Sequence, residues 1–178
     1  MNWRNTNDSF GLIAKSLHWG LAVVIIGLIA FGMYLANARI SVSQLHLYGW
    51  HKALGLLAFT FIILRVIWRI LSPKPIPIDP ENWQAKLANN IHWILYLLMV
   101  LMPLSGWIAS SAAGFPMSFF GLFPLPAIAP TSERLEGFFF AVHGIAGKLL
   151  ILSLLLHLAG ALQRQFVKHD GTMGRMWF

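Results

Sequence analysis

Two histidines bracket a long apolar run in the C-terminal half of the chain. The stretch HGIAGKLLILSLLLH begins at His143 and ends at His157. Fourteen residues make about 3.9 turns of an α-helix, so both imidazoles would point to nearly the same face, roughly 21 Å apart along the helix axis. One helix therefore offers two nitrogen ligands at two depths.

The elements that position these histidines are predicted to cross a membrane. Hydrophobic residues make up 57% of the 178 residues and charged residues only 11%, a balance typical of integral membrane proteins. Four apolar stretches, residues 17–36, 48–71, 91–112 and 138–162, reach the ~20 residues that span a hydrocarbon core. We expect one all-α domain over residues 1–178, a four-transmembrane-helix up-down bundle.

The first apolar stretch is predicted to be a retained helix. It is long, carries His18 and lacks the small-residue pattern of a signal-peptide cleavage site. The chain contains no cysteine, which excludes disulfides, thiolate-bound metal or iron–sulfur clusters, and covalent haem attachment.

The lysines and arginines predict the orientation of the bundle. In an up-down reading, nine fall on or near one side: Arg4, Lys15, Arg65, Arg69, Lys74, Lys86, Arg164, Lys168 and Arg175. The other four, Arg39, Lys52, Arg134 and Lys148, fall on the opposite side. Because cytoplasmic flanks are enriched in these residues, we expect both termini in the cytoplasm. The net charge of +7 is explained by this topology, and without a long basic run we expect no nucleic-acid partner.

Two further histidines match the depths of the first two. His18 begins the first span on the cytoplasmic side, as deep as His157, and His51 begins the second span on the outer side, as deep as His143. Two facing imidazole pairs are what two six-coordinate haem b groups require, with the porphyrins in apolar slots between helices.

The partner of His157 is left open by depth alone. His92 begins the third span on the cytoplasmic side and competes with His18 for that place. His46 and His169 fall in loops or tails and are expected to be solvated.

Two glycines follow the outer histidines at one helical turn. Gly55 comes four residues after His51, and Gly147 four residues after His143. The missing Cβ would give a flat macrocycle room against the helix. Small residues also allow close helix packing in lipid, so both interpretations stand.

Arg65 is a candidate partner of the inner haem. It follows His51 by fourteen residues and so shares its face at the depth of His157, where a guanidinium would bind haem propionates. The alternative, which we favour for Arg69, is snorkelling to the interface. Lys52 and Lys148 are predicted near the outer pair, where each could bind haem propionates or snorkel to the interface.

Other uses of intramembrane histidines are less consistent with this sequence. A zinc or copper transporter or a proton pump would place carboxylates, cysteines or methionine clusters near them. All six acidic residues fall outside the spans: Asp8, Asp79, Glu81, Glu133, Glu136 and Asp170. A single histidine often only bridges helices by hydrogen bonds, but four at two matched depths argue against that.

Five ordered motifs resemble the bacterial cytochrome b561 family, which is related to the cytochrome b subunits of nickel-iron hydrogenases. They are KSLHWG, HKALGLLAFTFIILRVIWR, HWILYLLMVLMPLSGW, GFPMSFFGLFPLP, and HGIAGKLLILSLLLHLAGAL with FVKHDGTMGRM. The resemblance implies a bacterial inner-membrane protein with two haem b groups. It implies ligation by His18 with His157 and by His51 with His143, and leaves His92 as a neighbour.

The same resemblance implies electron transfer between the periplasmic side and the quinone pool. One expectation is a superoxide:ubiquinone oxidoreductase, in which a basic outer mouth attracts superoxide. The alternative is a cytochrome b subunit that links a periplasmic dehydrogenase or hydrogenase to quinone. A transporter or structural bundle without haem is the third. The sequence assigns no quinone site, since its aromatic residues are indistinguishable from an interfacial belt.

Overall fold

The computed structural model describes residues 2–39, 41–78 and 82–178. Asp79 and Glu81, expected outside the spans, lie outside the described residues. The main helices are α1 (Leu12–Asn37), α2 (Leu45–Leu71), α3 (Trp83–Ala112) and α4 (Glu133–Gln163). Shorter elements are a 3-10 turn (Val42–Gln44), strands β1 (Ser118–Phe119) and β2 (Phe123–Pro124), and a π-helical turn (Arg164–Lys168).

The four long helices are apolar and long enough to cross a membrane, which confirms the predicted four-helix membrane fold. All four helices begin before the predicted apolar stretches, and polar side chains cap the early starts of α3 and α4. The Asn82 side chain accepts a hydrogen bond from the backbone N–H of Gln84 at the start of α3. Ser132 accepts one from Leu135 at the start of α4, where acidic residues in the first turn complement the helix dipole.

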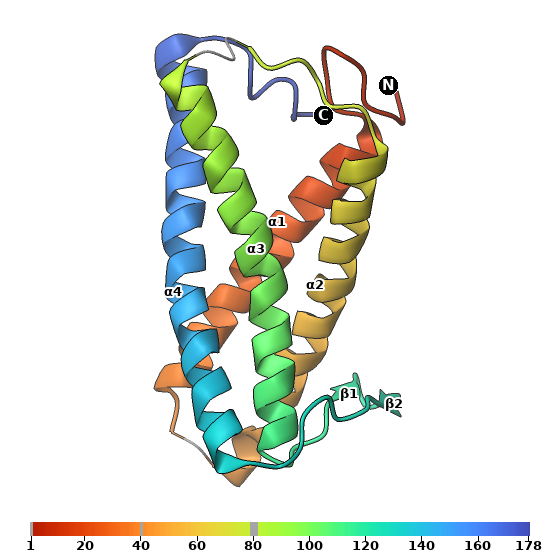
Figure 1. Ribbon diagram of the computed structural model, residues 1–178, viewed down its shortest axis with the longest axis vertical. Helices are drawn as coiled ribbons and strands as arrows, with labels where there is room; N and C mark the ends of the chain where they lie inside the picture. The colour runs from red at the N-terminus through yellow and green to blue at the C-terminus, as the bar shows by residue number, and fades with distance from the viewer. Residues whose placement is uncertain (1, 40, 79–81) are drawn as a thin grey trace.

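The helices pack unevenly around the bundle (Figure 1). α3 and α4 lie side by side, α1 packs on α2, and α2 contacts α3. By contrast, the backbones of α1 and α4, and of α2 and α4, hardly approach each other in the described part of the chain. Both termini lie at one end, here called the terminal end, and the β1–β2 hairpin lies at the other, the hairpin end.

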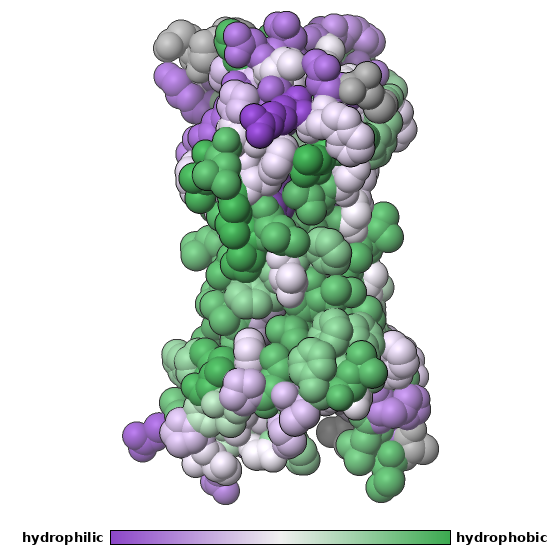
Figure 2. Space-filling model, turned by 90° about the vertical axis from the view of Figure 1, so that its right-hand side faces the viewer, coloured by the Kyte–Doolittle hydropathy of each residue, from purple (hydrophilic) through white to green (hydrophobic). Residues whose placement is uncertain are grey.

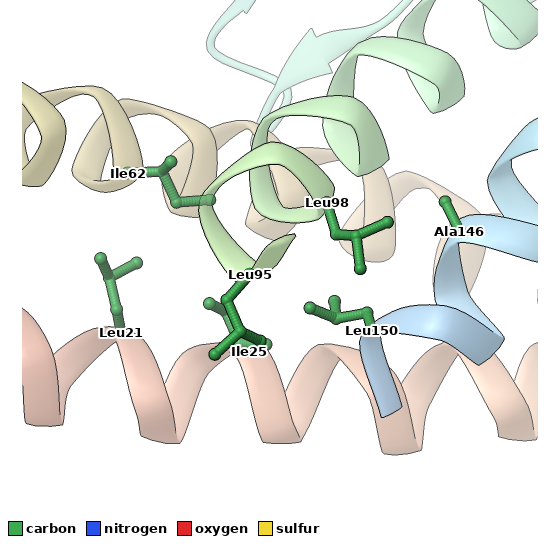
Figure 3. Close-up of a cluster of buried hydrophobic side chains, with 7 residues drawn as sticks. All are labelled: Leu21, Ile25, Ile62, Leu95, Leu98, Ala146 and Leu150. Carbon is green, nitrogen blue, oxygen red and sulfur yellow. The ribbon is translucent and has the colours of Figure 1, made fainter. Parts of the chain in front are cut away.

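The apolar core occupies the middle of the bundle and draws on all four helices (Figure 3). Its buried side chains are Leu21, Ile25, Ile62, Leu95, Leu98, Ala146 and Leu150. Outside the core, large apolar side chains face outward along every helix. Figure 2 shows them as a broad hydrophobic band between two more polar ends. Such a surface is one that contacts membrane lipid.

The chain termini pack over the terminal end. The indole N–H of Trp19 donates to the Met176 carbonyl at 3.0 Å, and the Trp19 and Trp177 rings lie edge to face with centroids 5.2 Å apart. Partial burial alone would raise the pKa of Asp170, but hydrogen bonds from Thr172 and its ion pair with Arg164 outweigh burial and lower that pKa. The contacts of Trp19 with Met176 and Trp177 thus attach the C-terminal segment to the start of α1.

The hairpin projects sideways from the bundle at the hairpin end (Figure 1). Ser118 pairs with Pro124 and Phe119 with Phe123. Its turn contains Phe120 with φ of 51°, a left-handed conformation that is uncommon for a bulky residue. The hairpin contacts α2.

Candidate functional site

The histidines at the hairpin end face each other across the bundle. His51 on α2 and His143 on α4 have ring centroids 6.4 Å apart, with the ring planes at 81°. These two helices hardly approach each other at the backbone, so the two rings meet across the gap between them. We call these residues the hairpin-end pair.

Three histidines meet at the terminal end. His18 on α1 and His157 on α4 have ring centroids 6.1 Å apart, and we call them the terminal-end pair. His92 on α3 lies closer, with its ring centroid 5.2 Å from that of His157. The structure thus brings together every predicted histidine ligand, and it places His92 beside the terminal-end pair.

The ring separations suit two imidazoles that share one iron. Nitrogens each about 2.0–2.1 Å from a metal, with ring centres about 1 Å farther out, place two opposite centroids about 6 Å apart. Both pairs match this separation, and the contact between His92 and His157 is shorter. Among the described residues no group of three histidine or acidic side chains converges on one point. The donor set therefore fits haem, which needs two axial ligands, better than zinc, which takes three or four from protein.

The surroundings of His143 select the tautomer that a haem iron needs. Its Nδ1 lies 2.9 Å from the backbone carbonyl of Met102 and 3.2 Å from the Ser105 hydroxyl. That hydroxyl itself donates to the Met102 carbonyl. Nδ1 therefore donates its proton to this carbonyl, and Nε2 is left with a free lone pair. Such a hydrogen bond orients a metal-binding imidazole and raises its basicity.

His51 has no comparable support. Its Nδ1 is buried and has no hydrogen-bond partner among the described residues. A buried polar atom without a hydrogen-bond partner lowers the stability of the folded protein. The ring is instead positioned by packing against Phe31, with centroids 5.7 Å apart.

Two glycines that the sequence did not single out, Gly32 and Gly106, contact the histidine rings at the hairpin end. A Cβ on Gly32 would lie 3.1 Å from Cε1 of His51, and one on Gly106 would lie 3.2 Å from Cε1 of His143. Each imidazole thus rests on a glycine of the neighbouring helix. The sequence gives no spacing signal for this, because the contacts join different helices.

The predicted glycines have different surroundings. A Cβ on Gly55 would meet no atom within 4 Å, so the space beside this helix turn is open. At Gly147 the terminal methyl of Met102 lies 3.6 Å from the Cβ position. Room for a cofactor at Gly147 therefore depends on this flexible side chain.

Arg65 reaches the terminal-end pair, as its spacing predicts. Its guanidinium lies 2.8 Å from Nδ1 of His18, and its Nε donates to the Tyr96 hydroxyl at 3.4 Å. A second guanidinium, of Arg69, lies over the Tyr96 ring, 5.1 Å from the centroid. Tyr96 was not singled out from the sequence, where nothing distinguishes it from an interfacial tyrosine.

The Arg65 contact bears on the tautomer of His18. A guanidinium only donates, so Nδ1 of His18 accepts, and a neutral ring then carries its proton on Nε2. Ligation of iron through Nε2 requires the opposite tautomer. If a haem were held through Nε2 of His18, Arg65 would have to release this ring, and its charge would become available to another acceptor.

Comparison with known proteins agrees with this geometry. Residues 9–178 match the family described as prokaryotic cytochrome b561. The chain is 32% identical to cytochrome b561 homolog 2 of Escherichia coli (strain K12), over 99% of this chain and 95% of that protein. It is 27% identical to cytochrome b561 homolog 1 of the same organism, over 71% and 72%. A Yersinia pestis protein named "Probable superoxide oxidase CybB" is also 27% identical, over 71% and 72%. The chain therefore belongs to the prokaryotic cytochrome b561 family, whose members are membrane electron-transfer proteins with haem b.

Proposed function

We propose that the protein is a superoxide:ubiquinone oxidoreductase that holds two haem b groups. The observation that carries the proposal is the arrangement of two facing histidine pairs at opposite ends of one bundle, with 6.4 and 6.1 Å between ring centroids. We assign His51 and His143 to one haem and His18 and His157 to the other. When bound, haem supplies a one-electron iron couple.

The chain itself provides the surroundings of these two sites. The buried apolar core includes Leu150, which lies midway between His143 and His157 on α4, so a buried apolar layer separates the two pairs. Arg65, released from His18, is proposed to bind the propionates at the terminal end. Buried imidazoles and a dry interior are the protein's means of tuning haem potential.

The charge distribution supports an orientation with the hairpin end facing the periplasm. Arg39, Lys52 and Arg134 lie at that end, against the acidic Glu133 and Glu136, whereas Lys148 lies halfway along α4. The excess of one positive charge at the hairpin end attracts a small anion such as superoxide. The other nine lysines and arginines lie towards the terminal end, which the positive-inside rule assigns to the cytoplasm of a bacterial inner membrane.

The overall reaction is balanced by two superoxide ions for each quinone. Each superoxide loses one electron and leaves as dioxygen. Ubiquinone gains the two electrons and two protons and becomes ubiquinol. The relative named as a probable superoxide oxidase supports superoxide as the electron donor for the present chain.

The proposal is tested with the detergent-purified protein. A reduced-minus-oxidised visible spectrum and an extracted haem count are expected to give two low-spin haem b per chain. Superoxide from xanthine oxidase should then drive reduction of decylubiquinone by the isolated chain. If both haems are present but superoxide leaves them oxidised, the superoxide step is wrong. A role as the cytochrome subunit of a periplasmic dehydrogenase or hydrogenase would then take its place.

A further inference from the structure

The loop that joins α3 to α4 carries no charged side chain. Residues 113–132, which we call the hairpin loop, include no lysine, arginine, histidine, aspartate or glutamate. A loop that faces water ordinarily carries such residues, since they are the ones most favoured at exposed positions. The composition of the hairpin loop is therefore closer to that of the membrane spans than to that of a water-exposed segment.

Large apolar side chains of the hairpin loop are exposed. Leu122, in the turn, is 76% exposed, and Phe123, which begins β2, is 52% exposed. Phe115 and Ile128 are exposed as well. In Figure 1 the hairpin extends sideways from the bundle, beside the ends of the helices and not beyond them. When the helices cross a membrane, a segment in this position runs along the membrane surface.

The exposed surface of the hairpin loop continues onto α2. The rings of Phe120 and Trp50 meet edge to face, with centroids 5.5 Å apart, and Trp50 is itself exposed. Leu45, at the start of α2, is exposed too. A tryptophan near the end of a membrane span typically lies at the level of the lipid head groups. The contact with Trp50 therefore places the hairpin at that level.

The backbone of the hairpin loop finds hydrogen-bond partners within the protein. The Ser110 hydroxyl, at the end of α3, donates to the Phe115 carbonyl at 2.7 Å. The Trp107 indole N–H donates to the Pro126 carbonyl at 3.2 Å. Further backbone hydrogen bonds join the two strands and their flanking turns. Paired backbone groups are what an irregular segment needs in contact with lipid, where water does not replace a missing partner.

Prolines reduce the number of backbone donors that need a partner. The hairpin loop contains four of them: Pro116, Pro124, Pro126 and Pro130. Proline has no backbone N–H, so none of these positions has an N–H to desolvate. The loop thus combines exposed apolar side chains, no charge and a backbone with few free donors. These three features together favour an apolar environment over water.

We propose that the hairpin loop lies in the membrane at the boundary between lipid head groups and acyl chains, with Leu122 and Phe123 among the acyl chains. Its partner is the phospholipid surface at the hairpin end and not a soluble protein. Burial of the exposed apolar side chains provides the driving force, as it does for interfacial segments of other membrane proteins. The inference goes beyond the proposed electron transfer and holds whichever electron donor the protein uses.

The absence of cysteine from the chain allows a direct test. A single nitroxide label on Leu122→Cys reports on the hairpin turn. Arg134→Cys, at an exposed position in the first turn of α4, is the water reference at the same end. Leu152→Cys, at a position 54% exposed within α4, is the hydrocarbon reference. With the haem-loaded proteins in phosphatidylcholine nanodiscs, electron paramagnetic resonance compares the collisions of each nitroxide with oxygen, which concentrates in lipid, and with a water-soluble nickel chelate.

The unlabelled protein in the same nanodiscs provides a second measurement. Hydroxyl radicals produced in water modify the side chains that water reaches, and mass spectrometry locates the products. Phe123 is compared with Phe178, which has the same side chain, is 56% exposed and lies at the terminal end. The two phenylalanines are about equally exposed on the protein itself, so a difference between them measures cover by lipid.

The nitroxide on Leu122→Cys is expected to resemble that on Leu152→Cys, with a ratio of oxygen to nickel collisions several-fold above that of Arg134→Cys. Phe123 should be modified several-fold more slowly than Phe178. A water-like nitroxide on Leu122→Cys would overturn the proposal and leave the hairpin open to a soluble partner. Equal modification of the two phenylalanines would also overturn it, even with a lipid-like nitroxide, because the label would then have drawn the hairpin into lipid. Few collisions with either reagent would overturn it as well, and would assign the loop to a contact with another protein chain.

Discussion

Individual residues divide the two histidine pairs into unlike sites. At the hairpin end, His143 is oriented by the Met102 carbonyl, whereas Nδ1 of His51 has no partner among the described residues. At the terminal end, His18 contacts the Arg65 guanidinium. Because hydrogen bonds and nearby charge tune axial ligands, we expect the two haems to differ in potential.

Removal of one ligand should remove one haem. His51→Ala is expected to lower the haem content from about two per chain to about one, because the remaining imidazole alone cannot give six-coordinate iron. His18→Ala should do the same at the other end. The measurement is a pyridine haemochrome count on purified protein. His92→Ala is the control and should keep both haems, and loss of a haem there would make His92 a ligand in place of His18.

Arg65 should affect the potential of one haem more than its binding. Arg65→Ala removes a positive charge beside His18. The loss of this charge favours the oxidised iron, which carries more positive charge than the reduced iron. The potential of the terminal-end haem should fall, on the order of tens of millivolts, while the other haem keeps its value. Spectroelectrochemical titration separates the two. Arg69→Ala removes a charge that lies over Tyr96, and it should have the smaller effect. Equal effects of both variants would argue for a general surface charge.

At the scale of elements, hydropathy predicted the four helices but not their ends. Asn82 and Ser132 cap the starts of α3 and α4 in polar sequence. Average hydropathy over a window of residues gives no signal of a helix there. The hairpin lies within the motif GFPMSFFGLFPLP, for which no strands were predicted, since strands of two residues leave no alternating pattern. The contacts of Gly32 and Gly106 with the ligand rings join different helices, and no spacing in one chain segment reports such a contact. Depth along a helix, by contrast, follows directly from the sequence, which is why the facing pairs were predictable.

The C-terminal segment is expected to shield the terminal-end site. Trp19, next to His18, donates a hydrogen bond to the Met176 carbonyl and packs against Trp177. Trp177→Ala should loosen this cover, admit water near His18 and lower the potential of that haem, since water stabilises the more highly charged oxidised state. Potentiometry with and without a small exogenous haem ligand such as cyanide measures the change. Trp3→Ala, at an exposed tryptophan of the same end, is the control. If both variants shift the potential of that haem equally, the C-terminal segment does not shield the site.

The whole molecule separates its two sites by a dry layer and surrounds them with unequal charge. Side chains from all four helices form the layer. The hairpin end has an excess of one positive charge, from Arg39, Lys52 and Arg134 against Glu133 and Glu136. In the proposed orientation a diffusing anion therefore meets an attractive field at the periplasmic surface.

This field makes a prediction about rate and salt. If superoxide is attracted to the hairpin end, the second-order rate of haem reduction should fall as ionic strength rises from low to physiological values, because salt screens exposed charges beyond about 10 Å at 0.1 M. Arg134→Glu, in the exposed first turn of α4 at the hairpin end, should lower the low-salt rate several-fold and flatten the salt dependence. Lys168→Glu makes the same charge change at the terminal end and should leave the rate unaltered. Pulse radiolysis of protein in detergent measures all three. Equal slowing by both substitutions would mean that net charge controls the encounter, whereas a salt-independent rate would remove electrostatic attraction from the mechanism.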